Sequence, residues 1–169
     1  MADVNMEVIE REAFKKGALV EVNIEEPGFR GSWFTGTVIR TVTKKTRKLF
    51  IEYDTLMSDD GTTPLRESIN VILARPIAPR ERVRTFKMSE EVDANHNDGW
   101  WEGVVTAVHQ GDRYTVYFRP SKEEIVFSGA DLRLHREWVK GNWVPPLQQD
   151  EAEAEEGDEA EESDDEDED

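Results

Sequence analysis

The chain has 169 residues, no cysteine and a formal net charge of −17. The missing cysteines exclude a disulfide scaffold, thiolate metal sites and a cysteine nucleophile. No segment approaches the roughly 20 apolar residues that span a membrane, and the acidic N-terminal stretch lacks the apolar run of a signal peptide, so the sequence predicts a soluble intracellular protein.

The first half of the chain predicts a flexible N-terminus followed by short strands. Residues 1–13 are expected to be flexible or to form a short helix at 6–14. Alternating and β-branched stretches predict strands at 19–24, 33–42, 49–53 and 68–73. Because turn-rich pieces with proline, glycine, lysine and aspartate separate them, the pattern is typical of a small antiparallel barrel.

The second half repeats this order of elements. Strands are predicted at 83–86, 91–94, 100–108, 114–119, 122–127 and 132–134. Segments 20–22, 33–34, 51–53 and 73–75 align in turn with 92–94, 100–101, 116–118 and 132–134. An internal repeat of about 60–70 residues therefore predicts two units, at 14–76 and 80–146.

The connection between the units contains prolines at 76 and 79, which predict a short and stiff linker over 75–80. A unit of about 60 residues is marginally stable alone, so we expect the two to pack together. Trp138 and Trp143 follow the second unit and are expected to cover a barrel or the seam between the units.

An aromatic doublet stands in each unit, Trp33-Phe34 in the first and Trp100-Trp101 in the second. Each is followed by a spacer residue, a glycine and β-branched residues. Adjacent strand residues point to opposite faces. Each doublet should therefore send one ring to a core and the other to a surface or barrel mouth, which favours a pair of binding modules.

The acidity is concentrated at the C-terminus. Fifteen of the 38 acidic residues and no basic residue lie at 150–169, which leaves 23 acidic against 21 basic residues at 1–149. The composition predicts a disordered tail at 147–169. Such a tail can attract basic proteins, can simply solubilise the chain, or can cover the basic segments 44–48 or 80–87.

Several motifs then carry a family resemblance. In the first unit they lie at 14–22, 28–34, 52–56, 59–61 and 64–67, and in the second at 92–105, 114–118 and 131–138. Together they resemble a plant-type tandem Agenet domain over residues 14–146. The Agenet family belongs to the Tudor-like group, so the resemblance implies an all-β fold of two small Tudor-like bent antiparallel barrels packed in tandem.

The resemblance also implies a function. Tandem Agenet modules in plants read histone H3 tails methylated at lysine 9, which implies a nuclear chromatin reader with the H3 tail peptide as its partner. A box of aromatic faces with a carboxylate at its rim attracts the enlarged methylated ammonium. The alternatives are a methylation-independent histone-binding or chaperone-like scaffold and an RNA-binding Tudor-like module.

The resemblance to the Tudor-like group assigns candidate cage residues to matching positions of this sequence. The candidates in the first unit are Phe29, Trp33, Phe34, Tyr53 and Asp54; those in the second are His96, Trp100, Trp101 and Phe118. The pattern places Phe34 and Trp101 toward the barrel mouths, while Trp33 and Trp100 are expected to serve as packing or loop-wall residues. Leu56 and Ser121 stand where another aromatic would complete each cage.

Acidic residues near these rings are candidates for binding the lysine and arginine side chains of a basic tail. They are Glu25, Glu26, Asp59 and Asp60, and for Asp59 and Asp60 ordinary turn chemistry is the alternative. A ring of either doublet can likewise be a plain core residue.

Catalysis has little support in the sequence. The three histidines, His96, His109 and His135, show no metal-ligand spacing, and neither a nucleophile elbow nor a glycine-rich phosphate loop occurs. We therefore predict a protein that is not an enzyme and needs no cofactor or metal. The basic tip at 44–48 keeps nucleic acid open as a partner, although the near-neutral folded part and the acidic tail make it the less expected one.

Overall fold

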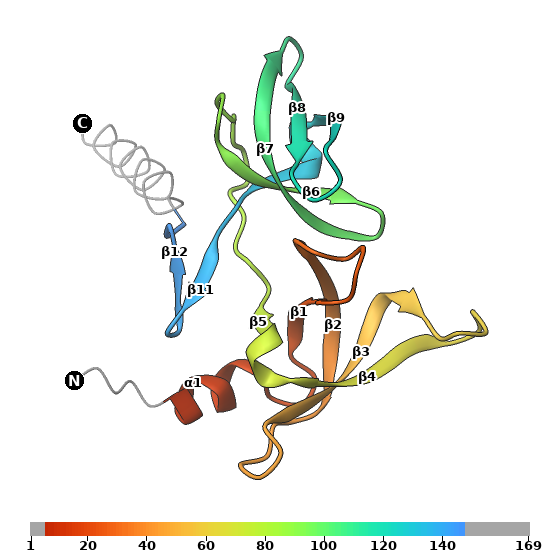
Figure 1. Ribbon diagram of the computed structural model, residues 1–169. Helices are drawn as coiled ribbons and strands as arrows, with labels where there is room; N and C mark the ends of the chain where they lie inside the picture. The colour runs from red at the N-terminus through yellow and green to blue at the C-terminus, as the bar shows by residue number, and fades with distance from the viewer. Residues whose placement is uncertain (1–5, 148–169) are drawn as a thin grey trace, which may run out of the picture.

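Residues 6–147 are described by the computed structural model, and their short strands form two curled units of the same topology (Figure 1). The helix α1 (Met6–Ala13) precedes the first unit. The strands of that unit are β1 (Leu19–Asn23), β2 (Ser32–Arg40), β3 (Lys48–Met57), β4 (Pro64–Asn70) and β5 (Ala74–Pro76). Apart from Leu147, the predicted acidic tail lies outside the described residues.

The second unit has the equivalent strands. They are β6 (Glu91–His96), β7 (Gly99–His109), β8 (Arg113–Phe118), β9 (Glu123–Ser128) and β10 (Leu132–Leu134). The strand order is β5-β1-β2-β3-β4 in the first unit and β10-β6-β7-β8-β9 in the second. The all-β prediction and the internal repeat are therefore confirmed, and no helix in the described part of the chain is long and apolar enough to cross a membrane.

Backbone pairing between β2 and β7 joins the two units into one ten-stranded sheet. Trp33 pairs with Trp100, and Ser32 pairs with Trp101. The two aromatic doublets thus meet directly at the junction. The sequence predicted packing between the units, and the structure adds that they share hydrogen-bonded strands.

Alternate side chains of the central strands fill each core, as the two-residue period of a strand requires. Along β2, buried and half-buried residues alternate from Ser32 to Ile39. Each unit has its own cluster of buried apolar residues, and Trp101 packs against both clusters. The two cores therefore touch through a ring of the second doublet.

Gly36 and Gly103, two residues after the second ring of each doublet, allow the next strand to approach closely. A Cβ at Gly36 would lie 2.7 Å from Cγ2 of Ile51, and one at Gly103 would lie 2.5 Å from Cγ1 of Val116. Real Cβ atoms do not make such contacts. The repeated glycine is thus explained by close strand approach at the same place in both units.

Two expectations for the chain need correction, and one alternative is decided. Residues 83–86 form no strand: Val83 is 91% exposed, and only Phe86 of this segment enters a core. Residues 71–73 form a 3₁₀ turn, since the Asn70 side chain accepts from the backbone N–H of Ile72 and ends the extended run. The segment expected to be flexible or helical contains α1 over 6–13.

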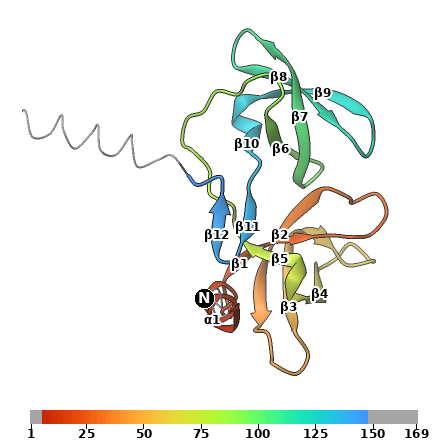
Figure 2. The same cartoon turned by 60° about the vertical axis from the view of Figure 1, so that its left-hand side comes forward.

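A hairpin of β11 (Glu137–Val139) and β12 (Asn142–Val144) follows the second unit. Its Trp138 and Trp143 rings lie 5.1 Å apart. Trp143 also lies 5.1 Å from the guanidinium carbon of Arg75, at the junction of the units. Figure 2 shows the hairpin beside β1 and α1, so these tryptophans lie at the seam, where the sequence places them.

Candidate functional site

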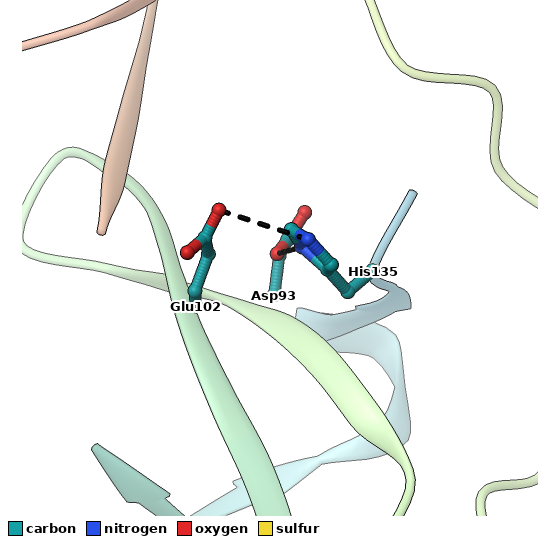
Figure 3. Close-up of side chains that lie close together, drawn as sticks. All are labelled: Asp93, Glu102 and His135. Atoms are coloured by element: carbon teal, nitrogen blue, oxygen red, sulfur yellow. Dashed lines mark hydrogen bonds and ion pairs between the residues drawn. The ribbon is translucent and has the colours of Figure 1, made fainter. Parts of the chain in front are cut away.

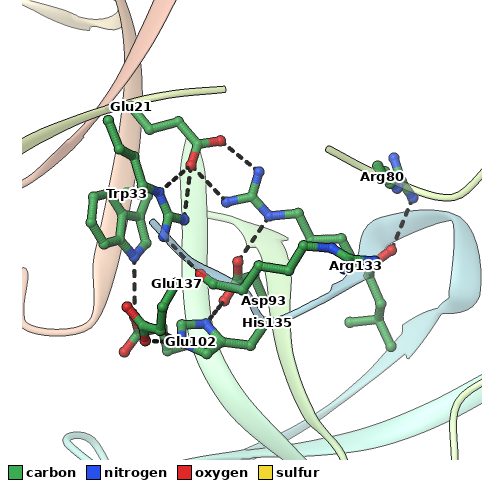
Figure 4. A network of polar contacts seen from close by, with 11 residues as sticks. Glu21, Trp33, Arg80, Asp93, Glu102, Arg133, His135 and Glu137 are labelled. Atoms are coloured by element: carbon green, nitrogen blue, oxygen red, sulfur yellow. Dashed lines mark hydrogen bonds and ion pairs between the residues drawn. The ribbon is translucent and has the colours of Figure 1, made fainter. Parts of the chain in front are cut away.

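A buried network of ion pairs joins the two units (Figure 4). Glu21 on β1 pairs with Arg75 on β5, and Asp93 on β6 pairs with Arg133 on β10. Arg133 also donates to Glu21, with 2.5 Å between Nη1 and Oε2. All four side chains are at most 2% exposed. Since buried charges are tolerated only when paired, this network fixes how the units meet.

Trp33 and Trp100 stack on the arginines of this network. The guanidinium carbon of Arg75 lies 3.5 Å from the centroid of Trp33, and that of Arg133 lies 4.3 Å from Trp100. Trp33 Nε1 also donates to Glu102 Oε1 at 3.1 Å. These rings already hold internal cations, so the structure corrects their predicted cage role and leaves them the packing role that was the alternative.

Phe34 and Tyr53 lie inside the core of the first unit, and each is 1% exposed. The ring of Phe34 is covered by Phe29 at 5.7 Å and by Trp101 at 6.1 Å between centroids. Burial, aided by the hydrogen bond that the Tyr53 hydroxyl donates to Glu67, raises the pKa of Tyr53. Neither ring offers an open face, so the cage predicted in the first unit is closed in this structure.

The acidic candidates Asp54, Asp59 and Asp60 lie near the end of β3 and in the turn after it. Thr55, next to Asp54, donates to the backbone oxygen of Asp98 in the second unit. Asp54 is exposed, and Asp59 and Asp60 belong to the turn after β3. Asp60 accepts hydrogen bonds from Ser58 and Thr62, which lower its pKa to about 2. These contacts are the turn chemistry that the sequence left open as the alternative for Asp60.

Two adjoining hollows between the units form what we call the acidic groove. One has a volume of about 590 Å³ and the other about 640 Å³, and both are lined by Glu25 and Glu102. The carboxylates that line the groove are Glu25, Glu26, Glu91, Glu102, Glu123 and Glu137. Two arginines, Arg30 and Arg119, also line it, so negative charge prevails.

Three predicted rings of the second unit line the smaller hollow, namely His96, Trp101 and Phe118. His96 stacks on Phe118 with 6.1 Å between centroids and 18° between planes. The ring of Trp101 stacks on that of Phe29, with 6.4 Å between their centroids. The fold thus brings these rings together with the predicted Glu25 and Glu26, which come from the other unit. We call this end of the groove the ring pocket.

One cluster in the described residues has metal-ligand chemistry, namely Asp93, Glu102 and His135, whose ligand atoms all lie within 4.8 Å of one another (Figure 3). His135 Nδ1 lies 2.8 Å from Asp93, and its Nε2 lies 2.6 Å from Glu137. Burial acts to lower the pKa of His135, but the hydrogen bond and charge of Asp93, with Glu137 and Glu102, raise it to about 9. Both ring nitrogens of His135 are thus engaged by carboxylates, so in this structure the cluster extends the ion-pair network.

His135 should make the stability of the fold depend on pH. Because its pKa is raised from 6.5 to about 9, its contribution is fully present below about pH 6.5 and is lost as the pH rises through 9. At about 1.4 kcal/mol per unit, the free energy of unfolding should fall by roughly 3 kcal/mol over this interval. Urea denaturation between pH 6 and pH 9.5 measures it.

The matched control for this prediction is His135→Gln, which keeps a hydrogen-bonding side chain without a titrating group. The decrease seen in the wild type should be absent from this variant. Equal slopes in the two proteins would show that other groups cause the pH dependence.

Several residues of the site were not predicted from the sequence. Glu102, Glu123 and His135 line the groove. Glu21 joins the units by pairing with Arg133, and Asp93 holds Arg133 within the second unit. A signal for Glu21 and Asp93 was present: each is a lone carboxylate between apolar residues at the same place in both repeats, in Val20-Glu21-Val22 and Val92-Asp93-Ala94.

The alignment of the repeats by sequence was off by one residue at their last strands. It matched Arg75 with Leu134, whereas the pairing of Arg75 with Glu21 and of Arg133 with Asp93 makes the two arginines equivalent. Each arginine pairs with a carboxylate more than 35 residues away in the chain. A local comparison of the last strands therefore could not reveal which residues of the two repeats are equivalent.

Both units of the chain are similar to known proteins. The model of the Agenet domain family matches residues 17–79 and 89–149. The Arabidopsis thaliana Protein AGENET DOMAIN (AGD)-CONTAINING P1 is 46% identical over 145 residues, covering 81% of this chain and 28% of that protein. DUF724 domain-containing protein 3 of the same plant is 40% identical over 135 residues, covering 78% and 19%. The chain thus spans less than a third of the length of these relatives.

Two solved structures have the same architecture. The crystal structure of Arabidopsis thaliana AGDP1 AGD34 matches with a TM-score of 0.76 and 36% identity, covering 84% of this chain and 98% of that chain. The crystal structure of ADCP1 tandem Agenet domain 3-4 matches with a TM-score of 0.73 and 35% identity, covering 87% and 100%. The predicted fold class is confirmed by these matches.

Proposed function

The chain belongs to the Agenet domain family, a family of protein-interaction modules, and from this we propose that it is a nuclear chromatin reader that binds the histone H3 tail. The mark that we propose is methylated lysine 9, with its methylated ammonium in the ring pocket of the second unit. The rest of the basic tail then lies along the acidic groove. No catalytic step is part of this function.

The observation that carries the proposal is the composition of the acidic groove. Rings from the second unit and carboxylates from both units line the two adjoining hollows. Aromatic faces attract a methylated ammonium, which keeps its charge but has fewer N–H donors. Carboxylates pair with unmodified lysine and arginine side chains. A methylated basic peptide has both features.

The ring pocket belongs to the second unit because the two units differ in one loop. In the first unit, the loop between β1 and β2 (residues 24–31) is long and carries Phe29, which covers Phe34. In the second unit, the loop between β6 and β7 spans only residues 97–98. Its ring site keeps an opening that Glu25, Glu26 and Pro27 of the first unit border.

Titration with H3 peptides of defined methylation tests the proposal. We expect dimethyl- or trimethyl-lysine 9 peptides to bind at least tenfold more tightly than the unmodified peptide, because a desolvated cation–π site contributes about 2 kcal/mol or more. In Trp101→Leu, which keeps an apolar side chain at the junction, this preference should be lost. Isothermal titration calorimetry on variants shown to be folded by circular dichroism measures it.

Two carboxylate variants separate the roles of the groove. Glu26→Gln should weaken every H3 peptide several-fold regardless of methylation, because it removes a groove charge. Glu12→Gln removes an exposed carboxylate of α1, outside the groove, and should leave binding unchanged. Binding that is indifferent to methylation in the wild type would instead favour the histone-binding scaffold, and no binding of any H3 peptide would contradict the proposal.

A further inference from the structure

Opposite the groove, one end of the first unit is densely positive. The residues, which we call the basic face, are Arg11, Lys15, Lys16, Arg40, Lys44, Lys45, Arg47 and Lys48. They come from α1, the segment that follows it, the end of β2, the β2–β3 turn and the first residue of β3. Figure 1 places α1 and this turn at the end of the first unit that points away from the second.

A hollow marks the centre of the basic face. It has a volume of about 560 Å³, and its lining includes Arg11, Lys15, Lys16, Lys44 and Arg47 together with Glu7 and Glu10. Cations from two segments that lie 28 or more residues apart in the sequence therefore surround one depression. The folded chain separates its charges, with carboxylates along the groove and cations at this end.

Most cations of the basic face lack a charged partner. In the described residues, ion pairs hold only Lys44, to Glu7 at 3.9 Å, and Arg47, to Glu10 at 2.6 Å. The other six have no ion pair within residues 6–147. α1 contributes three carboxylates and the basic face eight cations, so positive charge prevails at this end of the described residues.

The base of the basic face is rigid. Phe14 lies in the core of the first unit, and the Arg47 guanidinium donates both of its hydrogen bonds to the Glu10 carboxylate at 2.6 Å. The Arg40 guanidinium lies 4.5 Å over the ring of Phe50. The helix and the turn are therefore held together before any ligand binds, which lowers the entropic cost of binding.

From these contacts we infer that the basic face binds the phosphate backbone of duplex nucleic acid. Spaced lysine and arginine side chains neutralise phosphates and release counterions, which gives affinity without sequence preference. Phe14 is buried and Phe50 is covered by Arg40, so the face presents no free ring for stacking on single-stranded bases. A duplex with its regular double row of phosphates fits this arrangement best.

Fluorescence anisotropy of the full chain with a labelled duplex of about 20 bp at about 50 mM salt tests the inference. We expect the logarithm of the affinity to fall with the logarithm of the salt concentration with a slope of about −5, near −0.9 for each of six phosphate contacts. The triple variant Lys15→Gln, Lys45→Gln, Lys48→Gln should lose at least tenfold in affinity, and its slope should be shallower by about 2–3.

The matched control removes three exposed cations from the second unit and the segment before it, as Lys87→Gln, Arg113→Gln, Lys122→Gln. This control changes the total charge by the same amount as the triple variant of the basic face. It should lower the affinity for the duplex only two- to threefold. Equal losses in the two triple variants, an absence of salt-dependent binding by the wild type, or tighter binding of a single strand than of the duplex would each overturn the inference. H3 peptide affinity should not change in either variant, which keeps this test separate from that of the groove.

Discussion

Glu21→Gln should lower the free energy of unfolding by about 3–5 kcal/mol, the cost of leaving a buried charge without its partner. Glu21 accepts from Arg75 and from Arg133, and all three side chains are buried. Glutamine has nearly the same shape, so the packing is kept while two buried guanidinium groups lose their shared carboxylate. Urea denaturation followed by tryptophan fluorescence measures the change.

Glu52→Gln is the matched control for this prediction. Glu52 pairs with Arg66 at 2.7 Å across neighbouring strands, as Glu21 does with Arg75, but the Arg66 side chain is 56% exposed. An exposed pair of this kind contributes about 0–1 kcal/mol. If both substitutions had the same small effect, the network at the junction would be dispensable for stability.

Phe34→Ala should cost about 3–5 kcal/mol of stability, the range for deleting a buried phenylalanine ring. Phe34 is 1% exposed and is packed between Phe29, Trp101 and the core of the first unit. The expected loss is structural, because no face of this ring is open. Chemical denaturation measures it.

Phe34→Leu distinguishes this core role from the cage role that the sequence suggested. Leucine keeps apolar volume but removes the aromatic face, so the variant should be destabilised less than Phe34→Ala and should bind methylated peptides as the wild type does. A selective loss of methylated-peptide binding in a stable Phe34→Leu protein would show that the first unit carries a cage after all.

Strand positions could be predicted from the sequence where burial alternates along a strand. The stretch at 33–42 was placed within two residues of each end of β2, along which buried and half-buried residues alternate. The stretch at 100–108 was placed within one residue of each end of β7. The prediction failed at 83–86, where Val83 and Phe86 are both apolar but only Phe86 is buried. The local hydropathy pattern indicates which residues can be buried. It does not indicate whether a neighbouring strand is present to pair with them.

The kinds of residue that form the candidate site could be predicted from the sequence. Which of the candidate residues come together in it could be predicted less well. Strand parity correctly separated the two rings of each doublet onto opposite faces, yet it could not tell that Phe34 would be covered whereas Trp101 would border a hollow. That difference depends on Phe29, which the long loop of the first unit carries. It also could not show that Glu25 and Glu26 would border the ring pocket of the other unit.

The sequence by itself determined the two repeated all-β units, the aromatic doublets with their glycines and the charge imbalance, because each of these is a local or periodic property of the chain. The tertiary structure decided which rings stay open, since that follows from the pairing of β2 with β7 and from the Glu21–Arg133 contact between residues 112 positions apart. Those contacts place Arg75 and Arg133 on Trp33 and Trp100. They leave the ring pocket of the second unit open at the junction.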